Sequence, residues 1–308
     1  MNKKIKVISS DGKPAKIKNN ERTLLQETWR RFKRSKLAMA GMGFLSLLLI
    51  ISIGTVIIDL ITSNAFYENY VIKQELVNRL QGPSLRHLFG MDEFGRDVFL
   101  RIIWGTRYSL FMSVFAITIS MLIGGTFGAI SGFYGKSIDL IVMRFMDVLL
   151  AMPPMLLALT VVAALGPGLV NVIIAVAISY VPTFSRVLRA SVLTVRDKEY
   201  IESARAVGAS NVQIIFKFVI PNSLAPIIVQ GTLGVAGAIL TIASLSFIGL
   251  GIQPPLPEWG LMLSNARTYM REAWHITIFP GLAILLVILS LNLMGDGLRD
   301  ALDPRLKN

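Results

Sequence analysis

Few residues of this chain have the types and spacing that enzyme chemistry needs. The segment GFYGKS (132–137) is similar to the end of a phosphate-binding loop, but Ile130 stands where the first glycine belongs, and an apolar run precedes it where the motif needs a strand. The sequence contains no HExxH, GxSxG or dinucleotide-binding pattern. It has no cysteine, and its two histidines, His87 and His275, lie far apart. We therefore expect no catalytic residue, no nucleotide site and no transition-metal site in this chain.

The most distinctive polar segment is residues 197–221, which separates two long apolar stretches. Asp197 is a candidate N-cap for a first helix, and Gly208 suits the left-handed position that ends it. Ser210 and Gln213 have the spacing of a capping box, which predicts a second helix beginning there. Pro221 is expected to end that helix. The pattern predicts two short helices joined at a glycine.

One face of this segment is apolar, and it needs a partner. Each large apolar side chain contributes about 1.5 to 3 kcal/mol when buried, so the face must contact lipid headgroups, the protein's own membrane spans or another protein. A surface-lying connector is the simplest interpretation. The small side chains of Ser203, Ala204 and Ala206 favour instead close docking into a protein groove.

The surrounding chain has the composition of a membrane protein. Hydrophobic residues make up 53% of it, charged residues only 16%, and the mean hydropathy is +0.61. A membrane-spanning helix needs about 20 apolar residues. Six segments meet this requirement, at about 37–61, 109–133, 139–165, 169–189, 223–249 and 276–295.

Prolines inside the predicted spans indicate kinks. Pro153 and Pro154 interrupt the third span, and Pro182 and Pro280 lie in the fourth and sixth. A kink is also what a gating helix would use, so Pro153, Pro154 and Pro182 are candidate gating residues.

Ionisable residues are scarce inside the spans. Asp59 lies near the outer end of the first span, where we expect it to reach water without a special role. Arg144 and Asp147 lie one helical turn apart in the third span, and we expect a structural pair there. The lack of charge in the middle of the spans fits peptides of varied sequence better than a single ion.

Glycines recur at regular spacing in two of the spans. Gly124, Gly128 and Gly132 are four residues apart, and Gly231, Gly234 and Gly237 are three apart. Small residues on one helix face allow close approach of a second helix. The spacing fits packing within the bundle or dimerisation, and both alternatives stay open.

The distribution of charge predicts the orientation. Residues 1–36 hold twelve Lys or Arg against three acids, a net charge of +9. The cluster RRFKRSK (30–36) precedes an apolar run, which indicates a cytoplasmic topology signal and not nucleic-acid binding. Part of this tail is expected to lie as an amphipathic helix on the inner leaflet. We therefore divide the chain into a basic cytoplasmic tail (1–36), a first span (37–61), an extracytoplasmic loop (62–108), a five-helix core (109–295) and a cytoplasmic C-terminal tail (296–308).

The predicted extracytoplasmic loop contains GMDEFGRD (90–97). Asp92, Gly95, Arg96 and Asp97 are expected to form a turn with internal ion pairs, which is either a stable loop or a docking surface. Trp259 and Trp274 bracket the other outer loop and are expected to be membrane-interface anchors.

Several segments resemble one known family. Glu202-Ser203-Ala204, three residues, Gly208, nine residues and a hydrophobic run ending at Pro221 resemble the EAA signature of ABC-importer permeases, with Ser203 and Ile220 in place of the usual alanine and leucine. FGMDEFGRDVFLRIIWGTRYSL (89–110), LSFIGLGIQPPLPEWGLML (245–263) and NLMGDGLRDALDPRL (292–306) resemble segments of the second, C-type permease subunit of dipeptide and oligopeptide importers. The resemblance covers residues 37–306.

This resemblance implies an all-α integral membrane fold of the type I ABC importer, with six transmembrane helices and a cytoplasmic coupling segment. Glu202, Ser203, Ala204, Gly208 and Pro221 would dock on an ATPase. The implied partners are a homologous second permease, two ATP-binding subunits that hold ATP and Mg, an extracytoplasmic peptide-binding protein and the lipid bilayer of the cell membrane. No cofactor is expected in this chain.

The sequence allows more than one substrate and more than one class of membrane protein. The same family carries nickel chelates and glutathione, and the sequence names no substrate-binding residue. An ion-coupled secondary transporter would place titratable groups at mid-span, where none is evident. A membrane scaffold without transport activity would need no kinked spans.

Overall fold

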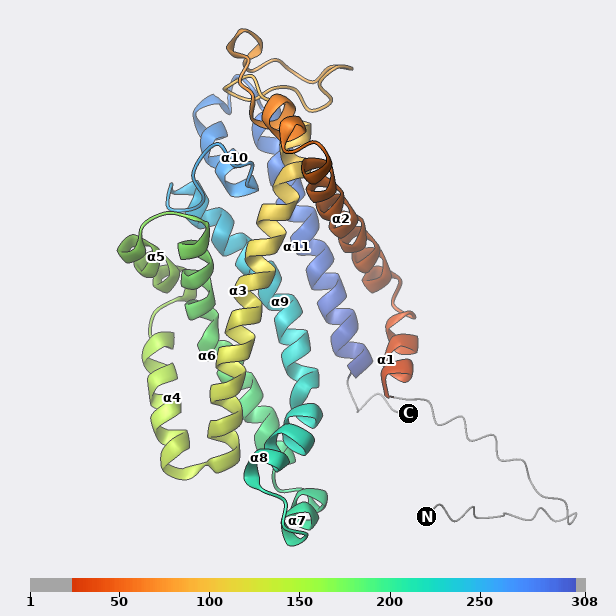
Figure 1. The fold of residues 1–308 in the computed structure, drawn as a ribbon, viewed down its shortest axis with the longest axis vertical. Helices are drawn as coiled ribbons and strands as arrows, with labels where there is room; N and C mark the ends of the chain where they lie inside the picture. Colours follow the sequence, from red (N-terminus) through yellow and green to blue (C-terminus); the bar gives the residue numbers. More distant parts are fainter. Residues whose placement is uncertain (1–23, 303–308) are drawn as a thin grey trace, which may run out of the picture.

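The structure is a computed structural model that describes residues 24–302. Within that range the chain forms a helical bundle, and its one extended pairing is a single bridge between Met91 and Asp97. Five helices are long and apolar enough to cross a membrane: α2 (Lys36–Ile61), α3 (Val98–Tyr134), α6 (Leu169–Val195), α9 (Ile220–Phe247) and α11 (His275–Leu302). The expected all-α membrane fold is confirmed (Figure 1).

The third of the six expected spans is broken. Its two parts, α4 (Lys136–Leu150) and α5 (Pro154–Leu165), meet at an angle of 84°. Pro153 has an extended backbone and Pro154 begins α5, because proline disfavours a helical conformation in the residue before it. The predicted kink at Pro153 and Pro154 is confirmed, whereas its role in gating stays a prediction. By contrast, α6 and α11 continue through Pro182 and Pro280.

Three spans are longer than the apolar runs predicted. Helix α3 begins at Val98, eleven residues before the predicted start, and α6 and α11 run on to Val195 and Leu302. The predicted boundaries of these spans lie at charged residues, because they are based on hydropathy alone. In the structure several of those charges, such as Arg107 and Arg189, form ion pairs with neighbouring helices, so the helices continue through them.

The centre of the bundle is the contact between α3 and α6, and glycines make it close. A Cβ atom on Gly124 would lie 2.3 Å from the carbonyl oxygen of Val181, and one on Gly128 would lie 2.3 Å from that of Ser185. Gly132 packs in the same way against Val192. These three glycines therefore serve packing inside this chain. Helix α9 packs against both α3 and α6.

The first described helix, α1 (Leu24–Phe32), packs against the C-terminal end of α11. Phe32 is buried beside Ala38 and Ala301, while Trp29 is exposed. Ser35 then caps α2 through Ala38 N. Both described ends of the chain lie in the same half of the molecule as α7 (Figure 1). The residues of the basic tail before Leu24 lie outside the described part.

The two ends of the bundle differ. One carries the short helices α7 (Glu199–Ala206) and α8 (Asn211–Ile214), and the π-turn η3 (Ile215–Val219) follows them. The other carries α10 (Trp259–Ala266) and the loop between α2 and α3 (Figure 1). The short turns of this second end are η1 (Tyr67–Ile72), η2 (Leu76–Asn78) and η4 (Arg267–Tyr269).

Two sequence predictions at this second end were wrong. Trp259 is only 1% exposed, and its indole Nε1 donates to Ile102 O at 3.1 Å, so it is not an interface anchor. Asp59 is buried, not hydrated: it is ion-paired with Arg107, and Trp104 Nε1 donates to its carboxylate at 3.1 Å. Both partners come from α3, whose extension over this region the hydropathy pattern did not predict.

Candidate functional site

The predicted coupling segment begins at α7, and its N-cap differs from the prediction. Lys198, not Asp197, occupies the cap position, with an extended backbone and no side-chain cap bond. The turn after α6 places Asp197 one residue too early to cap. Its carboxylate lies 3.3 Å from Arg196 Nε instead.

The C-terminus of α7 has the predicted glycine geometry. Gly208 adopts a φ of +85°, and its N–H donates to Arg205 O at 2.9 Å. The next N–H, from Ala209, donates to Ala204 O at 3.0 Å. These two bonds form a Schellman motif, which satisfies carbonyl groups that the helix end would otherwise leave free. The predicted left-handed position at Gly208 is confirmed.

The second helix begins as predicted but does not end as predicted. The Ser210 hydroxyl accepts from Gln213 N and the Gln213 side chain accepts from Ser210 N, a complete capping box. The chain then passes through the π-turn η3 directly into α9, so Asn211–Phe247 forms one helix of 37 residues. Pro221 directly follows the π-turn η3 within this continuous helix, and the helix does not end there.

The motif residues project from the end of the bundle. Glu202, Ser203 and Gly208 are exposed, and Ala204 is half-buried against the core. Val207, beside the glycine, is 86% exposed. Ile201 is fully buried and anchors α7 to the core. We call the surface formed by Glu199–Gly208 the elbow; it is ordered by its own hydrogen bonds and exposed outside the bundle (Figure 1).

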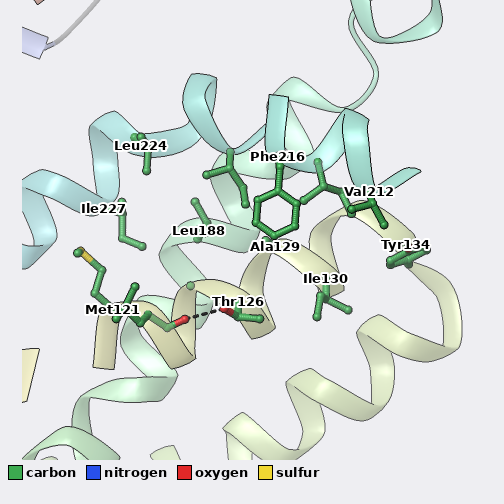
Figure 2. Close-up of a pocket in the computed structure, with 14 residues that line it drawn as sticks. Met121, Thr126, Ala129, Ile130, Tyr134, Leu188, Val212, Phe216, Leu224 and Ile227 are labelled. Carbon is green, nitrogen blue, oxygen red and sulfur yellow. Dashed lines mark hydrogen bonds between the residues drawn. The ribbon is translucent and has the colours of Figure 1, made fainter. Parts of the chain in front are cut away.

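Beside the elbow is an apolar hollow of about 520 Å³ between α3, α6 and the start of α9. Figure 2 shows the Phe216 ring pointing toward Ala129 and Ile130 of α3. Val212, Phe216 and Tyr134 at its rim are exposed. The hollow has no charged side chain in its lining, so it offers packing and no chemistry.

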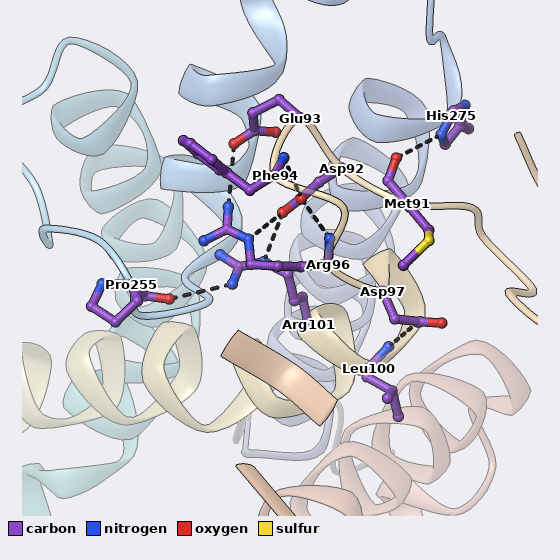
Figure 3. Close-up of polar contacts among 10 residues, drawn as sticks. All are labelled: Met91, Asp92, Glu93, Phe94, Arg96, Asp97, Leu100, Arg101, Pro255 and His275. Carbon is purple, nitrogen blue, oxygen red and sulfur yellow. Dashed lines mark hydrogen bonds and ion pairs between the residues drawn. The ribbon is translucent and has the colours of Figure 1, made fainter. Parts of the chain in front are cut away.

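At the opposite end, the loop GMDEFGRD forms the predicted turn (Figure 3). Asp92 Oδ1 accepts from the backbone N–H groups of Phe94 and Arg96, each at 2.9 Å, and Arg96 Nε donates to Asp92 Oδ2 at 2.7 Å. Gly95 has a φ of +68°, and a Cβ there would lie 2.0 Å from Glu75 O. The predicted internal ion pair of Asp92 with Arg96 is confirmed.

Buried polar contacts link this turn to α3, to the start of α11 and, through Arg101, to the loop that contains Pro255. Arg101 of α3 is 1% exposed, lies 3.4 Å from Asp92, and donates to Pro255 O at 3.3 Å. His275 at the start of α11 pairs with Met91 O at 3.2 Å. Figure 3 shows these side chains converging on the turn. Burial, together with the charge of Asp92, raises the pKa of Glu93 above its ordinary value.

Two acidic residues at this end cap helices. Asp97 accepts from Leu100 N at the start of α3, and its carboxylate pairs with His87 Nδ1 at 2.8 Å. Glu258 accepts from Gly260 N at 2.8 Å and Leu261 N at 2.7 Å at the start of α10. Glu258 is buried, and this burial raises the pKa of its carboxyl group.

The predicted coupling residues and the predicted loop residues therefore form two groups at opposite ends of the bundle (Figure 1). The candidate gating residues belong to neither group: Pro153 and Pro154 lie at the break between α4 and α5, and Pro182 lies within α6. No group of three or more His, Asp or Glu residues within 24–302 has the arrangement of a metal site. GFYGKS spans the end of α3 and the start of α4, so it is not a loop that follows a strand.

Two segments of this sequence match known protein families. Residues 124–308 match the family described as binding-protein-dependent transport system inner membrane component, and residues 23–83 match the N-terminal TM domain of oligopeptide transport permease C. This chain belongs to the binding-protein-dependent transport permeases.

Relatives and solved structures agree with this assignment. The dipeptide transport system permease protein DppC of Alkalihalophilus pseudofirmus is 47% identical over 92% of this chain and 90% of that protein. The glutathione transport system permease protein GsiD of Pectobacterium atrosepticum is 45% identical over 93% of each. A permease chain of the MetNI methionine ABC transporter, in an inward-facing conformation, superposes with a TM-score of 0.55 at 18% identity, over 67% of this chain and 98% of that one, which shows a shared fold.

The sequence analysis did not predict a group of ion pairs and hydrogen bonds near the elbow that joins α3, α4 and α6 of this permease. Asp139 of α4 accepts two bonds from Arg189 of α6, at 2.5 and 2.6 Å, and one from Ser131. Arg196 Nη1 donates to Gly132 O at 2.7 Å. Asp147 pairs with Arg186 of α6 at 2.6 Å, not with Arg144 as predicted. Apart from Ser131 and Asp139, which are eight residues apart, the partners are 39 to 64 residues apart, so sequence spacing carries no signal for them.

Proposed function

We propose that this chain is the permease subunit of an ATP-driven importer of dipeptides and oligopeptides. It forms the membrane path together with a homologous second permease. The observation that carries the proposal is the elbow: a short helix anchored by Ile201 and closed by the Schellman motif at Gly208, yet exposed beyond the bundle. A surface that is both ordered and unpartnered suits docking of another subunit.

Two ATP-binding subunits supply the energy, and they hold ATP and Mg. This chain acts as a permease without enzymatic activity of its own. Closure of the ATPase pair moves the elbow, and the motion passes through α8 into α9, because these segments are continuous. Glu202, Ala204 and Gly208 are the residues on which this coupling depends most.

The opposite end receives substrate. An extracytoplasmic peptide-binding protein docks on the loop between α2 and α3 and on the region of α10, where Asp92, Arg96 and Arg101 give a fixed shape. In this orientation the elbow and both chain termini are cytoplasmic, and the protein resides in the cell membrane. The long apolar surfaces of α2 contact lipid.

A peptide substrate is supported by the names of two relatives, a dipeptide permease and a glutathione permease. Glutathione is itself a modified tripeptide, so it is the second candidate. Nickel chelates remain an alternative within the same family. Membership of a binding-protein-dependent family argues against an ion-coupled secondary transporter.

The test replaces Gly208 with valine. A β-branched residue at φ +85° is strained, and a left-handed conformation costs an ordinary residue roughly 1 to 2 kcal/mol. Space is not limiting, because no atom lies within 4 Å of a Cβ built at this position. We expect normal membrane insertion but a severalfold loss of ATP-dependent dipeptide uptake in cells that express the whole transporter.

Gly208→Asn is the matched control, because asparagine tolerates the left-handed region, and its uptake is expected to stay near that of the unmodified protein. Uptake in Gly208→Val equal to that of the unmodified protein would count against coupling through the elbow. If ATP depletion leaves uptake intact while an ionophore abolishes it, the importer assignment is wrong.

A further inference from the structure

Two hollows open along a single face of α9. One, of about 530 Å³, lies between α6, α9 and α11 near the elbow. The other, of about 350 Å³, lies between α5, α9, α10 and α11 toward the opposite end. Their α9 residues include Asn222, Val229 and Leu233 in the first and Leu240, Ser244 and Phe247 in the second. At 100° per residue these six side chains fall within about 60° of one another around the helix.

Helices α6 and α11 extend this face on both sides. Val187 and Ser191 of α6 line the first hollow, and Tyr180 shares their face of the helix. A Cβ on Gly237 would lie 2.4 Å from Tyr180 Oη, so Tyr180 reaches α9 between the two hollows. On α11, Gly281 lines the second hollow and Arg299 the first, and Asn292 lies on the same helix face between them. We call this surface the route face.

Several exposed hydroxyl groups on other outer surfaces of the bundle form hydrogen bonds within their own helices. The exposed hydroxyls of Thr118, Thr160 and Ser46 each donate to the carbonyl four residues earlier in their own helix, at 2.7 to 2.8 Å. A hydroxyl bonded in this way can face lipid at little cost.

The route face carries two amide side chains that, unlike these hydroxyls, form no hydrogen bond within the described residues. Gln230 is half-buried at the first hollow and Asn292 is exposed. Neither amide has a hydrogen-bond partner among residues 24–302. Moving an amide without a hydrogen-bond partner from water into the lipid core costs several kilocalories per mole. We therefore exclude lipid as the neighbour of this face. Leu233 packs against Gly295, which sets these stretches of α9 and α11 side by side.

We propose that the route face is the wall along which an extended peptide passes, and that Gln230 and Asn292 hydrogen-bond to its main chain. Each amide offers two donors and an acceptor, which matches the N–H and C=O of a peptide group whatever its side chains are. Recognition of the main chain permits passage of varied sequences. This inference rests on the proposed peptide import, and it assigns the contact residues that the sequence left unknown.

Single cysteines test whether the route face is wet and contacts peptide. The chain has no native cysteine, so Gln230→Cys, Asn292→Cys and the lipid-facing control Thr118→Cys each give one reporter. The assembled transporter, in membrane vesicles, is treated with a charged, water-soluble thiol reagent, with and without trialanine. We expect labelling at positions 230 and 292 but not at 118, and slower labelling when trialanine is being transported.

Labelling at 230 and 292 as slow as at 118 would overturn the inference. Crosslinking of these two cysteines to the second permease in every state would also overturn it, because the amides would then serve subunit packing. Uptake of trialanine by the unmodified transporter is measured first. Absence of uptake would defeat the proposed peptide import itself, whereas uptake without protection at 230 and 292 defeats only the route face.

A second experiment separates main-chain contact from a structural role. Gln230→Leu and Asn292→Leu are compared with Thr118→Val in uptake of trialanine and of an analogue in which an ester replaces one amide. Loss of one neutral hydrogen bond is expected to lower trialanine uptake about two- to tenfold, with a smaller loss for the ester. Equal losses for both substrates, or no loss, would overturn the assignment.

Discussion

At the scale of single residues, the outer end of the protein is organised around Asp92. Its carboxylate pairs with Arg96 and Arg101, two arginines that are almost completely buried, and also accepts two backbone N–H groups; Glu93 is a second partner of Arg96, at 3.2 Å. Removing one member of a buried ion pair leaves the other charge uncompensated, which costs more than the pair contributes.

We predict that Asp92→Ala destabilises the protein strongly. Because the buried Arg101 loses its carboxylate partner and Arg96 keeps only Glu93, the expected loss is about 3 to 5 kcal/mol in the free energy of unfolding. The measurement is thermal unfolding of the purified protein in detergent. Lys73→Ala removes an exposed ion pair in the same loop, 3.7 Å from Glu75, and is expected to cost at most about 1 kcal/mol. Similar unfolding midpoints for the two variants would contradict this account.

Local spacing explains which contacts were predictable. Asp92 and Arg96 lie four residues apart in a glycine-containing turn, so their pairing follows from the sequence. Arg101 joins them only because the start of α3 is covered by the loop that contains Pro255. Asp59 and Arg107 meet across 48 residues for a similar reason. Hydropathy located the spans but not the tertiary partners of the charges at their ends.

At the scale of elements, the contact between α3 and α6 depends on the absence of side chains. We predict that Gly128→Ala destabilises the protein by about 1 to 3 kcal/mol, since the added Cβ would meet a backbone oxygen that cannot move freely. Gly54→Ala on α2, where no atom lies within 4 Å of the built Cβ, is the control and is expected to be neutral or slightly stabilising. Unfolding midpoints in detergent test both. A neutral Gly128→Ala would show that the helices separate without cost.

Helix α9 shows where sequence signals are ambiguous. Proline in a helix interior removes one backbone hydrogen bond and often kinks or ends the helix, but it does not always end it, since α6 and α11 continue through Pro182 and Pro280. Pro221 is predicted to end the second helix, but it follows the π-turn at Ile215–Val219 and the helix continues past it. The glycine-closed end of α7 and the capping box at Ser210 were predictable because each depends on residues within one turn of the chain.

At the scale of the whole molecule, the proposed topology puts the two ends of the bundle on opposite sides of the membrane. We predict that Val207→Cys is shielded from an impermeant maleimide in intact cells and reacts in inside-out vesicles, because the proposed orientation places the elbow in the cytoplasm. Leu85→Cys, in the outer loop, is expected to react in the reverse way. Both side chains are highly exposed, so burial does not confuse the result. Reaction of both cysteines from one side would refute the six-span topology.

The continuity of α8, η3 and α9 has a mechanical consequence. A helix of 37 residues spans about 55 Å, so a tilt of about 5° at its elbow end displaces its far end by about 5 Å. A break at Pro221 would absorb such a tilt locally. In the proposed coupling, the unbroken helix would act as a lever, and a small push on Val207 and its neighbours would arrive, enlarged, at Phe247 beside the second hollow.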